Sequence, residues 1–405
     1  MITKIAWRNL WRNKRRTVTS ISSIFFAVIL AILMRSLQEG SYGQMIDTAA
    51  RFYMGYAQVH QKGFWEDKSI NSLMTDLQET RTKILSDKNI KGAFGRLETY
   101  AMAATDTLTK GVMIVGTEPE GEDQLSNLSQ KVTKGQYLTS DSKDIIIGEG
   151  LANYLGITVN DTLALLGQGY HGASAAELYR VQGILKHPNP QMNNQVIYMS
   201  LPTVQYFVTA PNMINAYILD VHDNRKVDQT VAELKEKLDL DAYEVMSWSE
   251  LAPEMVTLIN TDREGGKIMI YILYVVIAFG IFSTILMMTI EREREFGILT
   301  AVGMIRRKIY SMLLQEALFI GLIGIVTSIL AGFPILLYME NHPILIEGAK
   351  GEAMAKMGME PILRFTASLD IIWPQALLMA LIMIVCTIYP IIHVARIKTV
   401  EAIHS

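Results

Sequence analysis

The chain is short of the residues that disulfide-bonded domains and metalloproteins depend on. Among its 405 residues there is one cysteine, Cys386, so an intramolecular disulfide is impossible. The histidines are scattered, and none has a partner at the spacing of metal ligands, so we expect no metal site. The formal net charge is only −3, which argues against a nucleic-acid-binding protein.

Signatures of nucleotide binding and hydrolysis are also missing. No G-x-x-x-x-G-K-[ST] segment and no G-x-S-x-G segment occurs, so we expect no cofactor on this chain and no catalytic residues. Gly167 to Gly172 does fit G-x-G-x-x-G. However, a second strand-like segment follows within a few residues, and no acidic residue lies about 20 positions further on. We interpret this stretch as a hairpin loop.

Long apolar runs are what the chain has in abundance. Half of its residues are hydrophobic, and they are concentrated in four runs, each about as long as a helix that crosses a bilayer. The first run could also be the core of a signal peptide, but no clean cleavage site follows it. The sequence therefore predicts four transmembrane helices, at residues 17–38, 267–290, 311–339 and 371–394.

Residues 39–266, between the first two runs, read as ordinary soluble protein. Apolar-polar alternation predicts strands at Tyr56–His60, Gly111–Val115, Asp144–Ile147, Thr162–Leu166, Tyr179–Leu185, Val196–Met199 and Ala216–Val221. Helical patterns lie between them at Ser72–Ser86, Glu149–Tyr154, Leu201–Val208 and Arg225–Leu238. The fold class that follows is an α-helical membrane protein with a large α+β domain inserted between its first and second spans. A second, smaller loop is expected at residues 340–370.

Positive charge predicts the topology. The strongly basic segments, residues 1–16, 291–310 and 395–405, all fall on one side of the four spans, which marks that side as cytoplasmic. Both termini would then be cytoplasmic, and the inserted domain would lie on the opposite side. Within residues 1–16, Trp7 and Trp11 are four apart while Arg8 and Arg12 occupy another face, as in a helix lying at the membrane surface. The alternative is a solvated basic segment that only sets topology.

The segment Glu291–Tyr310, EREREFGILTAVGMIRRKIY, joins the second and third spans. Glu291 and Arg294 are three residues apart, as are Arg292 and Glu295, so both pairs could form on a helix. Phe296, Leu299 and Ala301–Val302 are predicted to form one apolar side, and Gly303 is predicted to end the helix. We expect a cytoplasmic partner to bind this helix and move two spans together. Glu316, about one turn inside the third span, is expected to reach the interface or pair with an arginine.

The same segment resembles the hallmark of the FtsX-like ABC permease family, Glu-Arg-x-x-Glu-Phe-Gly-Ile-Leu-x-Ala-x-Gly-Met, at Glu291–Met304. Asn9–Arg16 is similar to the N-terminal helix of that family. Ile145–Leu163, Tyr179–Leu185 and Ile197–Gln205 resemble the MacB-type periplasmic core. Tyr389–Pro390 and Val400–Ala402 are similar to the closing motif of the family, although Val400 stands where the family has proline.

The resemblance implies a permease of the mechanotransmission type in the bacterial inner membrane, with its α+β domain in the periplasm. Two permease chains, identical or paralogous, would pair above a dimer of separate ATPase subunits, which bind the ATP and magnesium. The resemblance assigns coupling to the ATPase to a set of connector residues: Glu291, Arg292, Glu295, Phe296, Gly297, Ile298, Leu299, Gly303 and Met304. Within the family, the chain resembles the lipoprotein-releasing permeases, which implies lipoprotein cargo and a periplasmic carrier.

Two other functions stay open at this stage. One is MacB-like export of peptides or small molecules, although such proteins normally carry a fused N-terminal ATPase and only about sixteen residues precede the first span here. The other is FtsX-like regulation of a cell-wall hydrolase, although that family has a smaller extracellular domain. The loop containing Gly167, Gly169, Tyr170 and Gly172 is a possible periplasmic partner loop. It lacks the proline of the carrier-recruiting hook, so the sequence leaves its role open, along with the cargo and the pairing of permease chains.

Overall fold

The computed structural model describes residues 2–356 and 361–396, which form two compact units. The first unit is a helical bundle built from the described parts of Met1–Tyr42, Leu258–Ile344 and Ile362–Ser405. The second is the inserted domain, Gly43–Thr257 together with the described part of Leu345–Pro361. The family-like segment Val400–Ala402, and most of the expected tail 395–405, lie outside the described residues.

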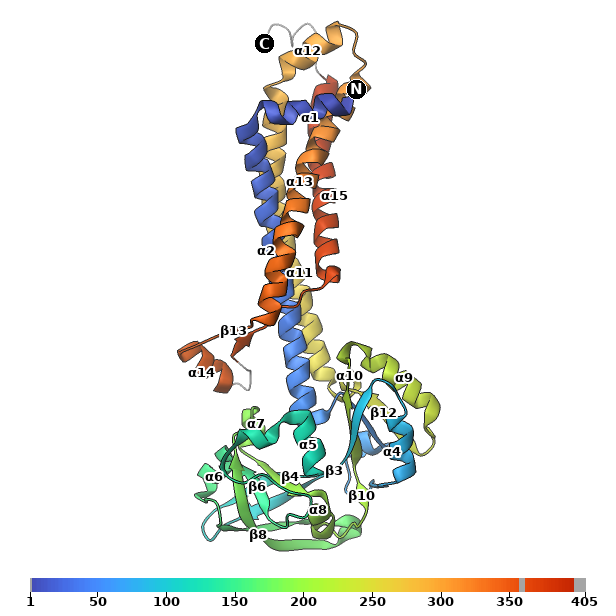
Figure 1. Ribbon diagram of the computed structural model, residues 1–405, viewed down its shortest axis with the longest axis vertical. Coiled ribbons are helices and arrows are strands. Elements are labelled where there is room, and N and C mark those ends of the chain that lie inside the picture. Colours follow the sequence, from blue (N-terminus) through green and yellow to red (C-terminus); the bar gives the residue numbers. More distant parts are fainter. Residues whose placement is uncertain (1, 357–360, 397–405) are drawn as a thin grey trace. The chain divides into compact units, whose positions relative to one another are not determined.

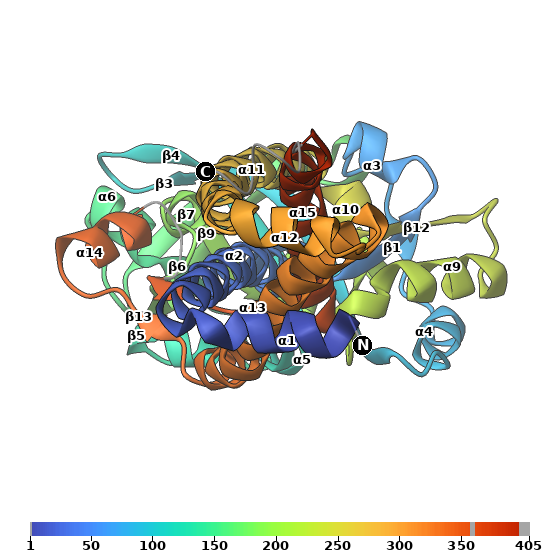
Figure 2. The same ribbon diagram turned by 90° about the horizontal axis from the view of Figure 1, so that it is seen from above.

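Four long helices make up the bundle (Figure 1). They are α2 (Lys14–Ala49), α11 (Pro253–Ile290), α13 (Arg306–Asn341) and α15 (Leu369–Arg396). Each is long and apolar enough to cross a membrane, which confirms the prediction of four transmembrane helices. Two shorter helices, α1 (Ile2–Arg12) and α12 (Glu293–Ala301), lie at the charged end of the bundle, as Figure 2 shows from above.

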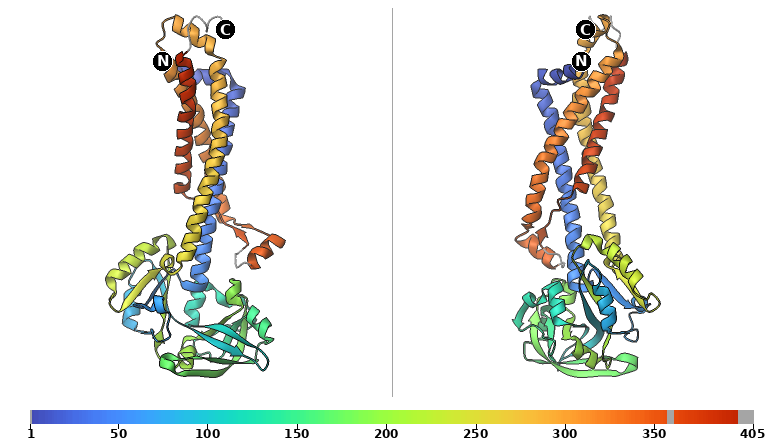
Figure 3. Two further views of the ribbon diagram at one scale, coloured as in Figure 1. Left: turned by 180° about the vertical axis from the view of Figure 1, so that it is seen from behind. Right: turned by 45° about the vertical axis from the view of Figure 1, so that its right-hand side comes forward.

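Small residues bring the long helices together, as expected for helices packed in lipid. A Cβ added at Gly324 of α13 would lie 2.6 Å from the Cγ2 of Ile24 on α2, and one at Gly321 would lie 3.0 Å from Met383 on α15. Deeper in the bundle, the hydroxyl of Tyr274 on α11 donates to the Oε1 of Gln375 on α15, at 2.8 Å. The neighbouring courses of α11 and α15 can be followed in the left-hand view of Figure 3.

The long helices extend beyond the apolar runs that predicted them. The first was expected to end at residue 38, but α2 runs to Ala49 and continues as a π-helix, η1 (Ala50–Met54), up to Gly55, whose φ is +72°. The second begins fourteen residues before the expected residue 267, at Pro253. The expected loop 340–370 contains β13 (Ile344–Leu345), α14 (Ala349–Lys356) and β14 (Ile362–Leu363).

The inserted domain is organised around a ten-stranded sheet in the order β12-β1-β11-β3-β4-β9-β6-β8-β5, with β7 pairing to both β3 and β8. That double pairing closes a ring of six strands: β3, β4, β9, β6, β8 and β7. The ring strands are β3 (Ile90–Ala104), β4 (Thr109–Thr117), β6 (Ile145–Gly148), β7 (Thr162–Gln168), β8 (Ser174–Leu185) and β9 (Val196–Ser200). The others are β1 (Ala57–Gln61), β5 (Val132–Gly135), β11 (Ala216–Val221) and β12 (Tyr243–Ser247), and a separate pair joins β2 (Met74–Thr75) to β10 (Met213–Ile214).

Strand β3 belongs to both parts of the sheet. Its first half, Ile90–Arg96, pairs with β11, and its last residues, Ala101–Ala104, pair with β7. Strand β4 pairs with β3 from Arg96 to Ala104, so it lies alongside the β7-paired residues and meets the β11-paired residues at Arg96. One continuous strand therefore connects the open sheet to the closed ring.

Part of the ring is buried on both faces. Along β4, Val112 and Ile114 belong to the main core, whereas Met113 and Val115 belong to a second cluster with Leu128 and Leu138. The continuous apolar runs of β4, β6 and β9 follow from this double burial. The helices that cover the domain are α3 (Phe64–Asp67), α4 (Gln78–Leu85), α5 (Pro119–Ser126), α6 (Glu149–Leu155), α7 (Pro190–Asn193), α8 (Leu201–Phe207), α9 (Val227–Lys237) and α10 (Trp248–Leu251).

All seven predicted strands are present, and the predicted α+β class is confirmed. The prediction of one helix over Ser72–Ser86 is wrong in its first part, because Met74–Thr75 pairs with β10 and the helix starts only at Gln78. The hairpin interpretation of Gly167–Gly172 holds: β7 and β8 pair antiparallel on either side of it.

Candidate functional site

The charged connector between α11 and α13 is the first candidate site. The expected connector at residues 291–310 contains α12, which ends at Ala301, and the first residues of α13, which begins at Arg306. Gly303 has a φ of +97°, and its N–H and that of Met304 donate to the carbonyls of Thr300 and Leu299. This is a Schellman ending, for which glycine is favoured because it adopts positive φ without strain. The predicted helix stop at Gly303 is confirmed.

A buried carboxylate holds the start of the connector. Glu316 of α13, 5% exposed, accepts from Arg292 at 2.7 Å and from the Nδ2 of Asn9 at 2.8 Å. The Nε of Arg292 also donates to Glu295, at 3.1 Å, as the spacing predicted. Pairing of Glu316 with an arginine was one of its two expected outcomes. One guanidinium thus links α12 to α13, and one asparagine adds α1 to the same group.

Arginines from α1 and α2 bind the outer carboxylates of the connector. Arg12 pairs with Glu295 at 2.5 Å, and Arg16 donates to both oxygens of Glu291. The hydrogen bond from Arg16 lowers the pKa of Glu291, and hydrogen bonds from Arg12 and Arg292 outweigh partial burial to lower the pKa of Glu295. The expected pairing of Glu291 with Arg294 is therefore replaced by a pair between residues 275 positions apart.

The inner face of α12 packs on an apolar cluster. Phe296 is 1% exposed and lies among Ala6, Ile309, Met312, Leu313 and Val394. Gly297 is buried, and Leu299 and Met304 are partly buried against the same cluster. The cluster draws on α1, α12, α13 and α15, so α12 is fixed to the bundle by packing as well as by charge.

The outer face of α12 and the turn after it are exposed and apolar. Ile298, Val302 and Ile305 are 47%, 83% and 65% exposed, and Ala301 is exposed beside them. The prediction of one apolar side shared by Phe296 and Val302 is thus wrong: the helix buries one and exposes the other. Arg294, Arg307 and Lys308 are exposed around this outer patch (Ile298, Ala301, Val302 and Ile305).

Helix α1 lies beside this site and presents its tryptophans at the edge of the bundle. Ala6 and Leu10, not the indoles, are the buried residues of α1. Trp7 and Trp11 are 45% and 41% exposed, and their rings make an edge contact at 6.0 Å. Trp7 also meets Phe319 of α13 at 5.6 Å. Arg8 is exposed, and Arg12 binds Glu295, so the cations of α1 do not all face outward.

The predicted partner loop lies at the tip of the β7–β8 hairpin. Tyr170 is partly buried against the main core, and its N–H donates to the carbonyl of Val208. Gly169 is closed in by the same carbonyl, 2.7 Å from where a Cβ would stand, whereas a Cβ at Gly172 would meet nothing within 4 Å. The structure therefore fixes one side of this loop and leaves the other open.

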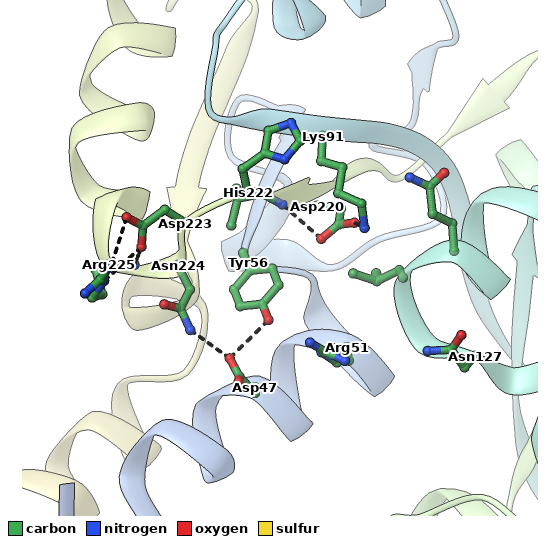
Figure 4. A pocket seen from close by; sticks show the side chains of 13 residues that line it. Asp47, Arg51, Tyr56, Lys91, Asn127, Asp220, His222, Asp223, Asn224 and Arg225 are labelled. Atoms are coloured by element: carbon green, nitrogen blue, oxygen red, sulfur yellow. Dashed lines mark hydrogen bonds and ion pairs between the residues drawn. The ribbon is translucent and has the colours of Figure 1, made fainter. Parts of the chain in front are cut away.

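A polar pocket of about 590 Å³ in the inserted domain is a second candidate (Figure 4). Asp47 at the end of α2 accepts from the hydroxyl of Tyr56 at 3.0 Å and from Asn224 at 2.8 Å. Lys91 pairs with Asp220, and Arg225 with Asp223, so most charges that line the pocket are matched within it. Its hydrogen bonds attach the end of α2 to the sheet, and we assign it that structural role.

Sequence reasoning did not identify Asn9 and Arg16 as partners of the connector. Both lie in the basic N-terminal segment, where composition suggests contact with lipid or solvent. Their partners are some 300 positions away in the chain, and no local pattern indicates such a pair.

Two family models match the chain. The MacB-like periplasmic core domain matches residues 17–237, more than half of the chain, and the FtsX-like permease C-terminal model matches residues 267–399. The first covers most of α2 and of the inserted domain, and the second covers the connector, α13, α15 and the larger part of α11.

Several relatives are similar over long stretches. The lipoprotein-releasing system transmembrane protein LolC of Xylella fastidiosa (strain 9a5c) is 22% identical over 410 residues, covering 97% of this chain and 96% of that protein. LolC of Neisseria meningitidis serogroup B (strain ATCC BAA-335 / MC58) is 20% identical, covering 78% and 76%. The uncharacterized ABC transporter permease YclI of Bacillus subtilis (strain 168) is 28% identical, covering 50% and 45%.

Among solved structures, the periplasmic region of MacB from Actinobacillus actinomycetemcomitans is 13% identical and covers 51% of this chain and 92% of that one, with a TM-score of 0.35. The two family models together cover most of the chain, and they confirm the resemblance seen in the connector and in the inserted domain. The chain therefore belongs to the FtsX-like ABC transporter permeases that carry a MacB-like periplasmic core domain.

Proposed function

We propose that this permease subunit receives the movement of a separate ATPase through α12 and passes it to the spans. The two-faced construction of α12 carries the proposal. Its inner face is fixed to the bundle by Phe296 and by the buried Arg292–Glu316 pair, while its outer patch is exposed. Exposed apolar residues rimmed by charge are typical of a surface that binds a partner protein.

The contacts of α12 explain how several helices would move together. Arg292 links the connector to α13, Arg16 of α2 binds Glu291, and Val394 of α15 lies in the same apolar cluster as Phe296. A displacement of α12 would therefore act on every long helix at once. The ATPase, which binds ATP and magnesium, supplies the energy, and this chain contributes no catalytic group.

For the cargo, we propose a lipoprotein that is released from the outer leaflet of the bacterial inner membrane. Support comes from the LolC relatives, which are similar over most of the chain. The chemistry also requires an energy source: each buried CH₂ contributes about 0.8 kcal/mol, so extracting several acyl chains costs on the order of tens of kcal/mol. Two permease chains would pair around the cargo, with both termini cytoplasmic and the inserted domain in the periplasm.

The coupling proposal is tested by replacing Val302 with aspartate. Because Val302 is 83% exposed, Val302→Asp should leave the fold intact while placing an unpaired charge in the contact. The tagged chain is purified from its native membranes, and the co-purifying ABC ATPase is quantified by mass spectrometry. We expect at least a tenfold loss of ATPase. Leu178→Asp, at a 69% exposed residue of the inserted domain, is the matched control and should retain it.

Full retention of the ATPase by Val302→Asp would refute the assignment of α12. The cargo proposal is tested separately, with proteoliposomes that contain the permease and its ATPase. Release of a triacylated protein should require ATP, whereas ATP hydrolysis that releases none of it would refute lipoprotein release and favour another cargo.

A further inference from the structure

The inserted domain has a small aromatic pocket that none of the roles above uses. It measures about 270 Å³ and lies where η1, α3, β1, β3 and β11 meet. Four of its walls are aromatic side chains: Tyr53, Phe64, Trp65 and Tyr100. Phe64 is buried, whereas Tyr53 and Tyr100 are exposed at the rim, so the pocket opens to solvent. Its volume lies just below the usual range for drug-sized ligands and suits a smaller molecule.

The pocket contains one carboxylate more than its buried cation needs. Arg96, 3% exposed, is already neutralised by Glu122, which lies behind it at 2.6 Å. Glu98 lines the pocket, its side chain is 30% exposed, and its closest approach to Arg96 is 3.4 Å. Counting Arg96 and Glu122 as a neutral pair, Glu98 leaves a net charge of −1 on the protein walls before Lys68 is considered.

Lys68 supplies the missing positive charge from the chain itself. Its ammonium lies 4.0 Å from the centroid of the Trp65 ring, within the range of a cation–π contact. Burial raises the pKa of Glu98, and the charges of Arg96 and Lys68 act in the opposite direction. Lys68 is exposed and follows the single turn of α3, so its side chain can leave the pocket without disturbing the core.

We propose that this pocket binds a small organic cation, whose ammonium group takes the place of Lys68 over the ring of Trp65 and is balanced by the charge of Glu98. The aromatic walls favour a cation over a neutral molecule of the same shape, because the faces of the rings are electronegative. Glu98, on the wall of the pocket, supplies the matching charge. The internal lysine competes with the ligand and keeps the site neutral when no ligand is present.

The test uses the full-length chain in a neutral detergent and isothermal titration calorimetry. The probe is n-butylammonium, which reproduces the end of a lysine side chain, with butan-1-ol as its uncharged analogue and choline as a quaternary ammonium. Lys68→Met removes the competitor, and Glu98→Gln removes the charge while keeping the shape. Circular dichroism and thermal unfolding check that each variant is folded.

We expect Lys68→Met to bind butylammonium at least about fivefold more tightly than the wild type, and Glu98→Gln to bind it at least about tenfold more weakly. Butan-1-ol, which has no charge, should bind to neither variant. A preference for choline over butylammonium would assign the site to quaternary amines, and the reverse preference to primary amines. Equal binding of butan-1-ol, or no gain of affinity in Lys68→Met, would overturn the proposal. A gain in Lys68→Met cannot result from misfolding, so the test remains decisive if Glu98→Gln is unstable. It involves no ATPase and is independent of the coupling proposal.

Discussion

Removing the guanidinium of Arg292 should release α12 from the bundle. The side chain of Arg292 is 13% exposed and that of its partner Glu316 is 6% exposed. Among the described residues, Arg292→Ala therefore leaves this buried carboxylate with Asn9 as its remaining hydrogen-bond donor. Breaking a buried ion pair in this way costs about 3–5 kcal/mol. Because some solvent reaches Arg292, we expect a cost near the lower limit, about 3 kcal/mol.

Hydrogen exchange of the α12 amides, followed by mass spectrometry, measures this loss directly. If opening of α12 becomes easier by about 3 kcal/mol, the amides of Glu293–Ala301 should exchange about a hundredfold faster than in the wild type. Arg294→Ala, which removes an exposed arginine from the same helix, is the matched control and should change exchange little.

A double variant separates charge from packing. Arg292→Met combined with Glu316→Leu removes both charges and keeps most of the volume, and it should restore much of the protection because no buried charge is left unpaired. Exchange in Arg292→Ala as slow as in the wild type would refute the argument that the buried pair holds α12. Loss of protection in the double variant as large as in Arg292→Ala would show that the charge is not the cause.

Three further variants test other parts of the molecule by thermal unfolding of the full-length chain. Gly324→Ala should destabilise the bundle by about 1–3 kcal/mol, because the new Cβ would stand 2.6 Å from Ile24. The control Gly280→Ala should be nearly neutral, because a Cβ there would meet no atom within 4 Å. Equal melting temperatures of the two variants would contradict the close contact at Gly324. Burial lowers the pKa of His60 from 6.5 to about 4, so the unfolded chain binds this proton at a higher pH than the folded protein does. The free energy of unfolding should therefore fall by roughly 3 kcal/mol as the pH is lowered from above 6.5 to 4. His60→Phe should reduce that slope, and an unchanged slope would exclude His60 as its source. Arg96→Met should cost about 3–5 kcal/mol by leaving Glu122 buried without its cation, and a small loss would indicate that water reaches the pair.

The four spans could be predicted because a helix that crosses lipid must be long and apolar, and such runs are visible in the sequence. The ends of these helices could not be predicted. Helix α2 continues to Ala49 and α11 starts at Pro253, in sequence that is no longer apolar, because backbone hydrogen bonding continues until a residue such as Gly55 interrupts it. Hydropathy marks where lipid ends, and it carries no information on where a helix ends.

Strands with apolar runs were predicted correctly, whereas the longest strand was missed. Strand β3 contains Gly92, Gly95, Arg96 and Glu98, a composition that local patterns associate with turns. Arg96 is tolerated there because Glu122, from a helix more than twenty residues away, neutralises it within the fold. A compensation of this kind lies in the tertiary structure and leaves no local pattern in the sequence.

The connector was predicted from its charges and glycine, but its pairs with the N-terminal helices were not. Arg292–Glu295 follows from helical spacing, and an arginine partner was expected for Glu316. The partners of Glu291 and Glu295 in the N-terminal segment, Arg16 and Arg12, were not predicted. Which face of α12 is buried also depended on where α1 and α15 pack. The position of the connector was therefore predictable from the sequence, whereas the partners that hold it were not.

Strand β3 belongs to both the open sheet and the closed ring, and this has a consequence for how such domains can vary. One unbroken strand pairs with β11 at one end and with β7 at the other, so the sheet and the ring are joined through the backbone of β3. The tips of the two hairpins, residues 105–108 and 169–173, lie beyond the paired residues, so either can lengthen or shorten without shifting a register. We expect related domains to keep this continuous strand and to bind different partners through different hairpin tips.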